Sequence, residues 1–213
     1  GMEYVDIFFC HRPDPEVQVD ETIRAIEDLI NQGKVLYWGT SMWTASDIDG
    51  AYDALVTLNM NRPVVEQPVY NMLDRDFVEG SLEESVGRHG MGFVVFSPLA
   101  EGTLTGKYND GIPGDSRVNL PGYEWLKEIL LGESGQARLE AVRQLGKVAD
   151  DLGTSMSRMA LAWCLKNPHV STVITGASKV EQVTENMEAI KIVPQLTDDV
   201  MKKIDEITAG LAE

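Results

Sequence analysis

The chain has 213 residues and a net charge of −16, with 43% hydrophobic and 24% charged residues. These values are ordinary for a soluble globular protein, and the length suits a single core of good size. The excess of acidic side chains argues against nucleic acid and anionic membrane surfaces as partners, because both would repel the protein at long range.

The N-terminal segment and the cysteines indicate a cellular setting. Gly1 ahead of Met2 is interpreted as a residue left by an expression tag. The first apolar run, residues 4–10, is too short to span a bilayer and follows no basic leader, so neither membrane insertion nor secretion is expected. Cys10 and Cys164 lack metal-type spacing and are interpreted as reduced core residues, and no metal site is expected. A cytoplasmic location is therefore predicted.

Strand and helix patterns alternate through the first half of the chain. Short apolar runs predict strands, whereas apolar residues three and four apart predict amphipathic helices. Gly33 and Gly90 are placed to end the first and third helices, and Thr44 or Ser46 to cap the second. In chain order the elements are a strand at 4–10, a helix at 20–33, a strand at 35–39, a helix around 48–55, a strand at 64–70, a helix around 78–90 and a strand at 93–96.

The alternation is interrupted after the fourth strand. Residues 110–122 are rich in Gly and Pro, and insertions of this kind at one end of a barrel often build ligand sites. The elements that follow are a short helix at 123–131, a helix at 139–149 stopped by Gly153, a helix from Ser155 through Trp163, a strand at 170–175, a helix at 179–189, and a last helix at 200–211 capped by residues 197–199.

Repeated strand–helix units with short links indicate parallel strands and right-handed crossovers. A doubly wound sheet would normally carry a GxGxxG fingerprint at its first strand–helix turn, and none is present, so a barrel is favoured. A full barrel has eight strands and typically ~250 residues, whereas five strands are predicted here. The predicted fold is therefore α/β, an incomplete (β/α)8 TIM barrel with about five parallel strands, in which residues 1–213 form one partial domain.

The segment 92–107, GFVVFSPLAEGTLTGK, combines a strand with a small-residue loop. Residues 93–96 are apolar without alternation, which suits a strand covered on both faces. Pro98 ends the ladder because it has no N–H to donate. Gly102 permits close backbone approach and Lys107 supplies a point charge. The loop could thus approach an anionic group, and an ordinary surface loop is the alternative.

Five segments, taken in order, resemble the aldo-keto reductases: HRPDP, YWGTSMW, EQPVYN, FSPLAEGTLTGKY and ITGASKVEQVTEN. The likeness is greatest to the branch that includes the β subunits of voltage-gated potassium channels and their bacterial relatives, and it covers residues 4–210. The resemblance implies a (β/α)8 barrel that binds NADPH at the C-terminal ends of its strands without a Rossmann motif. The chain corresponds to the fourth through eighth strands of that barrel.

One candidate catalytic residue follows from the resemblance. His11 matches the fourth member of the family's catalytic tetrad, which orients the substrate carbonyl, whereas the channel subunits commonly have Asn there. The family's catalytic Asp, Tyr and Lys lie on the first three strands, and no residue of this chain matches them. By chemistry alone, a single His in a turn is more often structural than catalytic.

The resemblance also implies contacts with the nicotinamide and the phosphates. Ser41 and Gln67 match residues that hold the nicotinamide carboxamide, and Phe96 takes the place of an aromatic residue that stacks on the ring. Strand-end caps or core side chains are the alternative interpretation. Asp115 stands where the channel subunits have an aromatic residue over the cofactor. The phosphate loop and its flank are matched by Ser97, Leu99, Gly102, Lys107 and Arg117.

The adenosine end is matched by Gly176, Ser178, Lys179, Gln182, Glu185 and Asn186. Here a strand ends, small residues open space, and a helix N-terminus offers free N–H groups and a positive dipole end. Lys179 could add charge for a 2′-phosphate, which favours NADPH over NADH. A plain helix N-terminus with a solvated lysine is the alternative.

These matches predict an NADPH-dependent carbonyl oxidoreductase by descent, with a small-molecule carbonyl substrate if the barrel is completed. The chain alone is expected to be inactive, because the family's tyrosine acid has no match. The alternatives are a non-catalytic NADPH-binding or channel-β-like regulatory subunit, and a remnant that binds no ligand. His11 favours the enzyme, and the missing tyrosine favours the binding subunit. Five strands leave two unpaired sheet edges, so a homo-oligomer, first of all a dimer, is expected.

Overall fold

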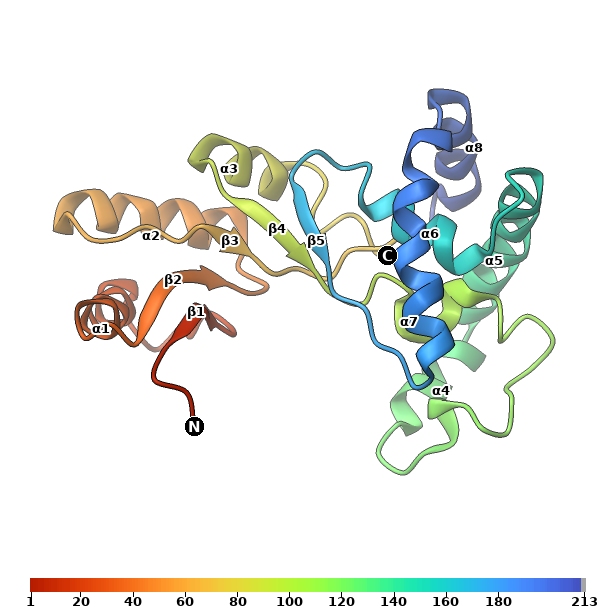
Figure 1. Cartoon of the computed structure of the whole chain (residues 1–213), viewed down its shortest axis with the longest axis horizontal. Helices are drawn as coiled ribbons and strands as arrows, with labels where there is room; N and C mark the ends of the chain where they lie inside the picture. The colour runs from red at the N-terminus through yellow and green to blue at the C-terminus, as the bar shows by residue number, and fades with distance from the viewer. Residues whose placement is uncertain (212–213) are drawn as a thin grey trace. The chain divides into compact units, whose positions relative to one another are not determined.

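The computed structural model describes residues 1–211. Five strands form one sheet in which each strand lies beside its neighbour in the sequence (Figure 1). The first four strands pair in parallel. The predicted α/β class with five parallel strands is confirmed, and the sequential strand order is that of part of a (β/α)8 barrel. The strands are β1 (Val5–Cys10), β2 (Val35–Thr40), β3 (Val65–Glu66), β4 (Gly92–Val95) and β5 (Val170–Val173).

The described chain divides into two compact units. Unit 1 holds nearly all of the sheet and three helices, and unit 2 holds the remaining helices and the long loops. Unit 1 consists of residues 1–69, 76–96 and 168–172, and unit 2 consists of residues 70–75, 97–167 and those from 173 onward.

Local sequence signals explain where the helices of unit 1 begin and end. At the start of α2, the Thr44 hydroxyl accepts the Asp47 N–H at 3.2 Å, and the Asp47 carboxylate accepts the Thr44 N–H at 2.9 Å. This reciprocal cap selects Thr44 from the two predicted candidates. Gly33 and Gly90 have φ of 69° and 68°, which confirms them as residues that end a helix. The three helices are α1 (Val19–Asn31), α2 (Ala45–Leu58) and α3 (Ser81–His89).

The core of unit 1 lies between the sheet and these helices. Trp38 of β2 is 1% exposed and packs with Ile23 and Ile26 of α1 and Leu55 of α2. Its indole N–H donates to the carbonyl oxygen of Asn61 at 2.8 Å, so its polar atom is also satisfied. Successive strand residues point to opposite faces, which makes this face of β2 the packed one.

The third strand is shorter than the predicted run at 64–70. Only Val65–Glu66 has regular pairing, and a single bridge between Val69 and Phe96 follows. Pro68 accounts for the break because it has no N–H for the ladder, although its carbonyl still accepts the N–H of Phe96 at 3.0 Å. The chain therefore continues beside β4 without forming a full strand.

The fourth strand is less enclosed than its apolar sequence predicts. Phe93 and Val95 are fully buried, whereas Val94 and Phe96 are half-buried. One face of β4 therefore packs in the core and the other is partly open.

Unit 2 is built from helices that pack on α5. α5 contacts α4, α6 and α8. The predicted cap at Thr197 is confirmed, because its hydroxyl accepts the Val200 N–H at 3.4 Å. Ser155, predicted to begin a helix, caps α6 by accepting the Arg158 N–H at 3.3 Å. The elements are η1 (Ala100–Thr105), η2 (Arg117–Asn119), α4 (Glu124–Leu131), α5 (Glu133–Asp151), α6 (Met156–Cys164), α7 (Val180–Met187), η3 (Glu188–Lys191), η4 (Val193–Gln195) and α8 (Asp198–Thr208).

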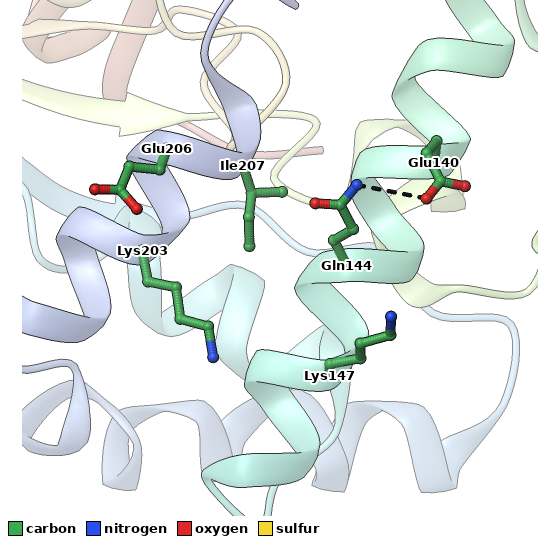
Figure 2. A pocket seen from close by; sticks show the side chains of 6 residues that line it. All are labelled: Glu140, Gln144, Lys147, Lys203, Glu206 and Ile207. Carbon is green, nitrogen blue, oxygen red and sulfur yellow. Dashed lines mark hydrogen bonds between the residues drawn. The ribbon is translucent and has the colours of Figure 1, made fainter.

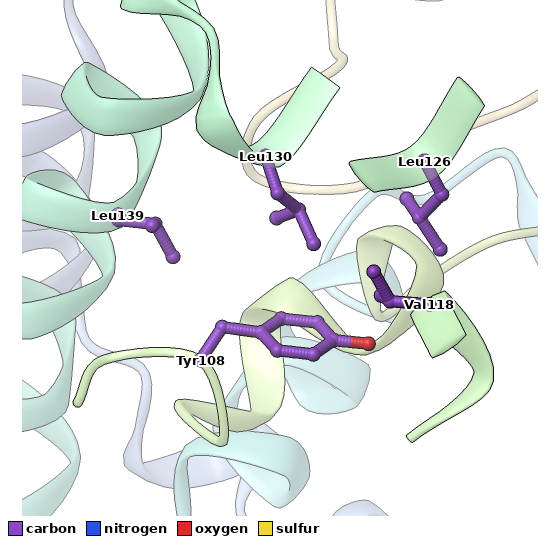
Figure 3. Close-up of a cluster of buried hydrophobic side chains, with 5 residues drawn as sticks. All are labelled: Tyr108, Val118, Leu126, Leu130 and Leu139. Carbon is purple, nitrogen blue, oxygen red and sulfur yellow. The ribbon is translucent and has the colours of Figure 1, made fainter. Parts of the chain in front are cut away.

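A hydrophobic cluster attaches the predicted insertion to α5 (Figure 3). Tyr108, immediately after Lys107, packs there with Val118, Leu126, Leu130 and Leu139, and all five side chains are buried. The cluster fixes the backbone on which Lys107 stands.

Both cysteines are free thiols, Cys164 buried and Cys10 half-buried. Burial raises the pKa of Cys10 to about 11 and that of Cys164 to about 12, so neither is a thiolate at neutral pH. Within residues 1–211, no group of three His, Cys, Asp or Glu side chains is arranged to hold a metal ion. Over the same residues, no helix has both the length and the apolar character that a membrane crossing requires.

Candidate functional site

Four of the predicted residues lie at one edge of the sheet in unit 1. His11, Ser41, Gln67 and Phe96 are each the first residue after β1, β2, β3 and β4, respectively. Because the strands are parallel and adjacent, their carboxyl ends meet at the same edge. In barrels of parallel strands this is the edge that carries ligand sites.

Ser41 joins the ends of three of these strands. Its N–H donates to the carbonyl oxygen of Cys10 at 3.1 Å, and its hydroxyl donates to the carbonyl oxygen of Gln67 at 2.8 Å. The Arg12 guanidinium donates to the same hydroxyl at 3.1 Å and to the carbonyl oxygen of His11 at 2.6 Å. Ser41 is buried, whereas His11 is exposed. The serine hydroxyl is thus held in one place.

A buried carboxyl group lies next to this serine and was missed in the sequence. Glu66, the last residue of β3, is 0% exposed and accepts hydrogen bonds from the Thr40 hydroxyl and the Trp43 N–H. Burial raises its pKa to about 7, against the opposing effect of these hydrogen bonds and of the Arg12 charge. An acidic residue inside the apolar run VVEQPV was the available signal.

In unit 2 the loop after β4 has an unusual backbone. Ser97, Ala100, Glu101 and Gly102 all have positive φ, between 45° and 96°. Left-handed residues in tight turns can direct backbone N–H groups into a concavity that suits an anion. Leu99 lies between them, and the loop ends in η1.

Two side chains that sequence reasoning missed contact this loop. Asn71 is buried and donates to the carbonyl oxygen of Ser97 at 3.0 Å, which fixes the start of the loop. The Glu101 carboxylate accepts a hydrogen bond from the Ser97 hydroxyl, with 2.8 Å between the two oxygens. Its negative charge opposes anion binding at this end of the loop. Asn71 ends the EQPVYN segment, so its position in that motif was the available signal.

The fit of a phosphate group to the loop can be tested at Gly102. A Cβ atom built there would lie 2.7 Å from both Cε and Nζ of Lys107. The ammonium group therefore rests on the bare glycine backbone, while the lysine side chain remains solvent-exposed. Beside it, the buried Tyr108 hydroxyl has no hydrogen-bond partner within the described residues. A cation, a hydroxyl without a partner and a backbone without a side chain suit an anionic ligand.

Arg117, like Lys107, lies over a tyrosine ring. Its guanidinium lies 5.5 Å from the ring centroid of Tyr123, and the arginine is exposed. Asp115, at the position where the resemblance leads one to expect an aromatic residue, is exposed as well. Tyr123 thus supplies an aromatic ring near Arg117 that the sequence comparison did not indicate.

The remaining predicted residues lie just before α7 and along it. The main-chain N–H groups of Ser178 and Lys179 both donate to the side-chain carbonyl oxygen of Gln182, at 2.8 and 3.1 Å. Two N-terminal donors of the helix are therefore directed at one oxygen acceptor. Of the other predicted residues here, Asn186 is buried, Glu185 is half-buried and Gly176 is exposed.

A surface hollow of about 470 Å³ lies elsewhere in unit 2, between α5 and α8 (Figure 2). It contains none of the predicted residues. Two lysines and two glutamates line it, so it has no charge preference that would select a ligand. The lining residues are Glu140, Gln144, Lys147, Lys203, Glu206 and Ile207.

Comparisons with known proteins agree with the motifs. The profile of the Aldo/keto reductase family matches residues 1–209. The chain is 47% identical over 207 residues to a protein of Schizosaccharomyces pombe named as a voltage-gated potassium channel subunit beta. It is 44% identical over 207 residues to an Arabidopsis thaliana protein with the same name. Each alignment covers 97% of this chain but only 60% and 62% of the respective relatives.

Proposed function

The chain belongs to the aldo/keto reductase family, and on that basis we propose that it binds NADPH and that its parent activity is the reduction of a carbonyl compound. The observation that carries the proposal is the position of His11, Ser41, Gln67 and Phe96, each directly after one of four adjacent parallel strands. Ligands of parallel-barrel enzymes bind at this edge.

In unit 1 the proposal concerns the nicotinamide and the substrate. Ser41 and Gln67 bind the carboxamide, Phe96 stacks on the ring, and His11 orients the carbonyl oxygen of a small-molecule substrate. When bound, NADPH supplies a hydride equivalent to the carbonyl carbon. Arg12 supports the site indirectly, because its hydrogen bonds hold the Ser41 hydroxyl and the His11 carbonyl.

In unit 2 the proposal concerns the phosphates and the adenosine. Lys107 and the glycine backbone beside it bind the pyrophosphate, with Arg117 as a further contact. The Lys179 charge and the positive dipole end of α7 favour the 2′-phosphate and hence NADPH over NADH. The remaining proposed contacts with the phosphates and the adenosine are assigned to Ser97, Leu99, Gly102, Gly176, Ser178, Gln182, Glu185 and Asn186.

Cofactor binding can be measured by titration. The chain has four tryptophans, so quenching of their fluorescence by NADPH provides a signal. We expect saturable but weak binding, and weaker binding of NADH. Lys107→Ala should lower the affinity for NADPH about tenfold, the effect of losing one charged contact to phosphate.

Lys147→Ala is the matched control, because it removes a lysine from the hollow between α5 and α8. Its affinity for NADPH should equal that of the wild type. No saturable signal at millimolar cofactor would contradict the proposal and favour a remnant without a ligand. Equal affinities for NADPH and NADH would contradict the role given to the 2′-phosphate.

A second function is favoured by the names of the two relatives, "Putative" and "Probable voltage-gated potassium channel subunit beta". In that case the chain binds NADPH without turnover and contributes to a complex with a potassium channel. The two functions differ in one measurable way: an enzyme with its full set of catalytic groups oxidises NADPH when a carbonyl compound is added, and a regulatory subunit does not.

We also propose that the protein self-associates, with a dimer as the first expectation. β1 stands at one end of the strand order, and Ile7 of β1 and its register partner Tyr37 of β2 are exposed apolar side chains on one face of the sheet. Soluble proteins rarely leave such a strand edge and surface uncovered. Light scattering coupled to size-exclusion chromatography should give a mass above the 23.5 kDa of one chain.

Ile7→Lys should shift this mass towards that of one chain, because it places a charge on the exposed surface. Val56→Lys is the control, since Val56 is exposed on α2 and away from the strands. A compact wild-type species at 23.5 kDa, independent of concentration, would exclude self-association through these surfaces.

A further inference from the structure

The turn between β2 and α2 is tied to β3 through Glu66. Glu66 is paired in register with Thr40, and one of its carboxyl oxygens accepts a hydrogen bond from the Thr40 hydroxyl. The other accepts the Trp43 N–H at 3.3 Å. One buried side chain therefore holds both ends of the segment 40–43.

The residue enclosed by these contacts is Ser41. Its neighbour Met42 has a left-handed backbone with φ of 56°, which is unfavourable for a residue other than glycine and asparagine. Such a conformation persists where surrounding contacts impose it. The hydrogen bond from Trp43 to Glu66 is a contact of that kind, and the Met42 sulfur adds another by accepting the Val69 N–H at 3.3 Å.

A carboxyl group is well suited to this task. It has two acceptor oxygens and can serve a backbone donor and a hydroxyl at once, whereas an apolar side chain would leave both buried donors without partners. The Arg12 guanidinium is the charged group that acts on it, and Arg12 also bonds to the Ser41 hydroxyl. Arg12, itself exposed, thus lies near both Ser41 and the buried Glu66.

We propose that Glu66 is a positioning residue, whose carboxyl group fixes the turn of residues 40–43 and thereby places the Ser41 hydroxyl for the nicotinamide carboxamide. This inference rests on the proposed binding of NADPH. It assigns Glu66 no contact with the cofactor, since its side chain is fully buried. Its loss should therefore affect recognition of the nicotinamide end and spare the adenosine end.

The experiment compares two ligands on folded protein. NADPH reports on both ends of the site, and adenosine 2′,5′-bisphosphate, which lacks the nicotinamide, reports on the adenosine end alone. Glu66→Leu should bind NADPH about tenfold more weakly and the bisphosphate as tightly as the wild type. Glu66→Gln keeps an acceptor oxygen for the backbone donor, the Trp43 N–H, so it should restore most of the NADPH affinity. Glu84→Leu, an exposed site on α3, is the control and should change neither affinity.

If Glu66→Leu does not fold, Thr40→Val tests the positioning role of Glu66 instead, because it removes only the hydroxyl that donates to the carboxyl group. It should lower the affinity for NADPH a few-fold and leave that for the bisphosphate unchanged. Equal loss of both ligands in these variants, or no loss of either, would overturn the positioning role. Failure of the wild type to bind either ligand would instead refute the proposed function, so the two failures are distinguishable.

The pH dependence of the free energy of unfolding gives a test that does not involve the cofactor. The pKa of Glu66 is raised from 4.5 in the unfolded chain to about 7 in the folded one, so the folded state holds this proton more tightly. Its contribution to stability is fully present below pH 4.5 and is lost as the pH rises through 7. The free energy of unfolding of the wild type should therefore fall relative to Glu66→Gln over this interval. A difference that is constant with pH would contradict the buried position of the carboxyl group.

Discussion

Replacing Trp38 with alanine should lower the free energy of unfolding by about 3–5 kcal/mol, the range for removing a large aromatic side chain from a core. Trp38 is 1% exposed and joins β2 to α1 and α2 through Ile23, Ile26 and Leu55. Its loss would leave a cavity at the centre of this cluster and would free the Asn61 carbonyl, which now accepts the indole N–H. Urea denaturation followed by circular dichroism measures the effect.

The neighbouring residue on the same strand provides the matched control. Tyr37 is 57% exposed and points to the opposite face of the sheet. Tyr37→Ala should therefore change the free energy of unfolding by no more than about 0.5 kcal/mol. Similar losses for the two variants would show that the helices do not pack on the Trp38 face of β2.

The 213-residue chain on its own should not reduce aldehydes or ketones. The developing alkoxide needs a positioned proton donor, and no residue of the chain matches the family's tyrosine acid. General acid catalysis is typically worth ~10²–10⁴ in rate. NADPH oxidation with a panel of aromatic aldehydes and dicarbonyl compounds should therefore stay at background.

In the same assay, His11→Ala tests whether His11 contributes to any turnover. If His11 has no acid to cooperate with, the variant and the wild type should give the same background rate. Turnover above about 1 s⁻¹, an ordinary rate for an enzyme, would show that the chain supplies a proton donor of its own. A drop in that turnover in His11→Ala would identify the histidine as part of the catalytic group.

Periodicity and capping signals were sufficient to predict the elements of the fold. The caps at Thr44, Ser155 and Thr197 were readable because short polar side chains directly precede an apolar helical pattern. The length of β3 was not readable, because the apolar run continues past Pro68 and the effect of the missing N–H depends on which neighbour the strand meets.

The candidate site was only partly predictable. The residues at the strand ends were found through family motifs, and the parallel order of the strands explains why four of them share an edge. The supporting groups Glu66 and Asn71 were missed, because their importance lies in hydrogen bonds to the main chain of distant residues. The positive φ at Ala100 and Glu101 was also unreadable, since neither residue type favours it.

Amide hydrogen exchange with and without NADPH tests the proposed site most directly. Bound cofactor should slow exchange in residues 39–43 and 66–67 of unit 1 and in residues 97–107 and 176–186 of unit 2. Residues 140–147 and 203–207, which border the hollow between α5 and α8, should exchange at the same rate in both conditions. Protection confined to these last two segments, or no protection at saturating cofactor, would contradict NADPH binding by the residues that follow the strands.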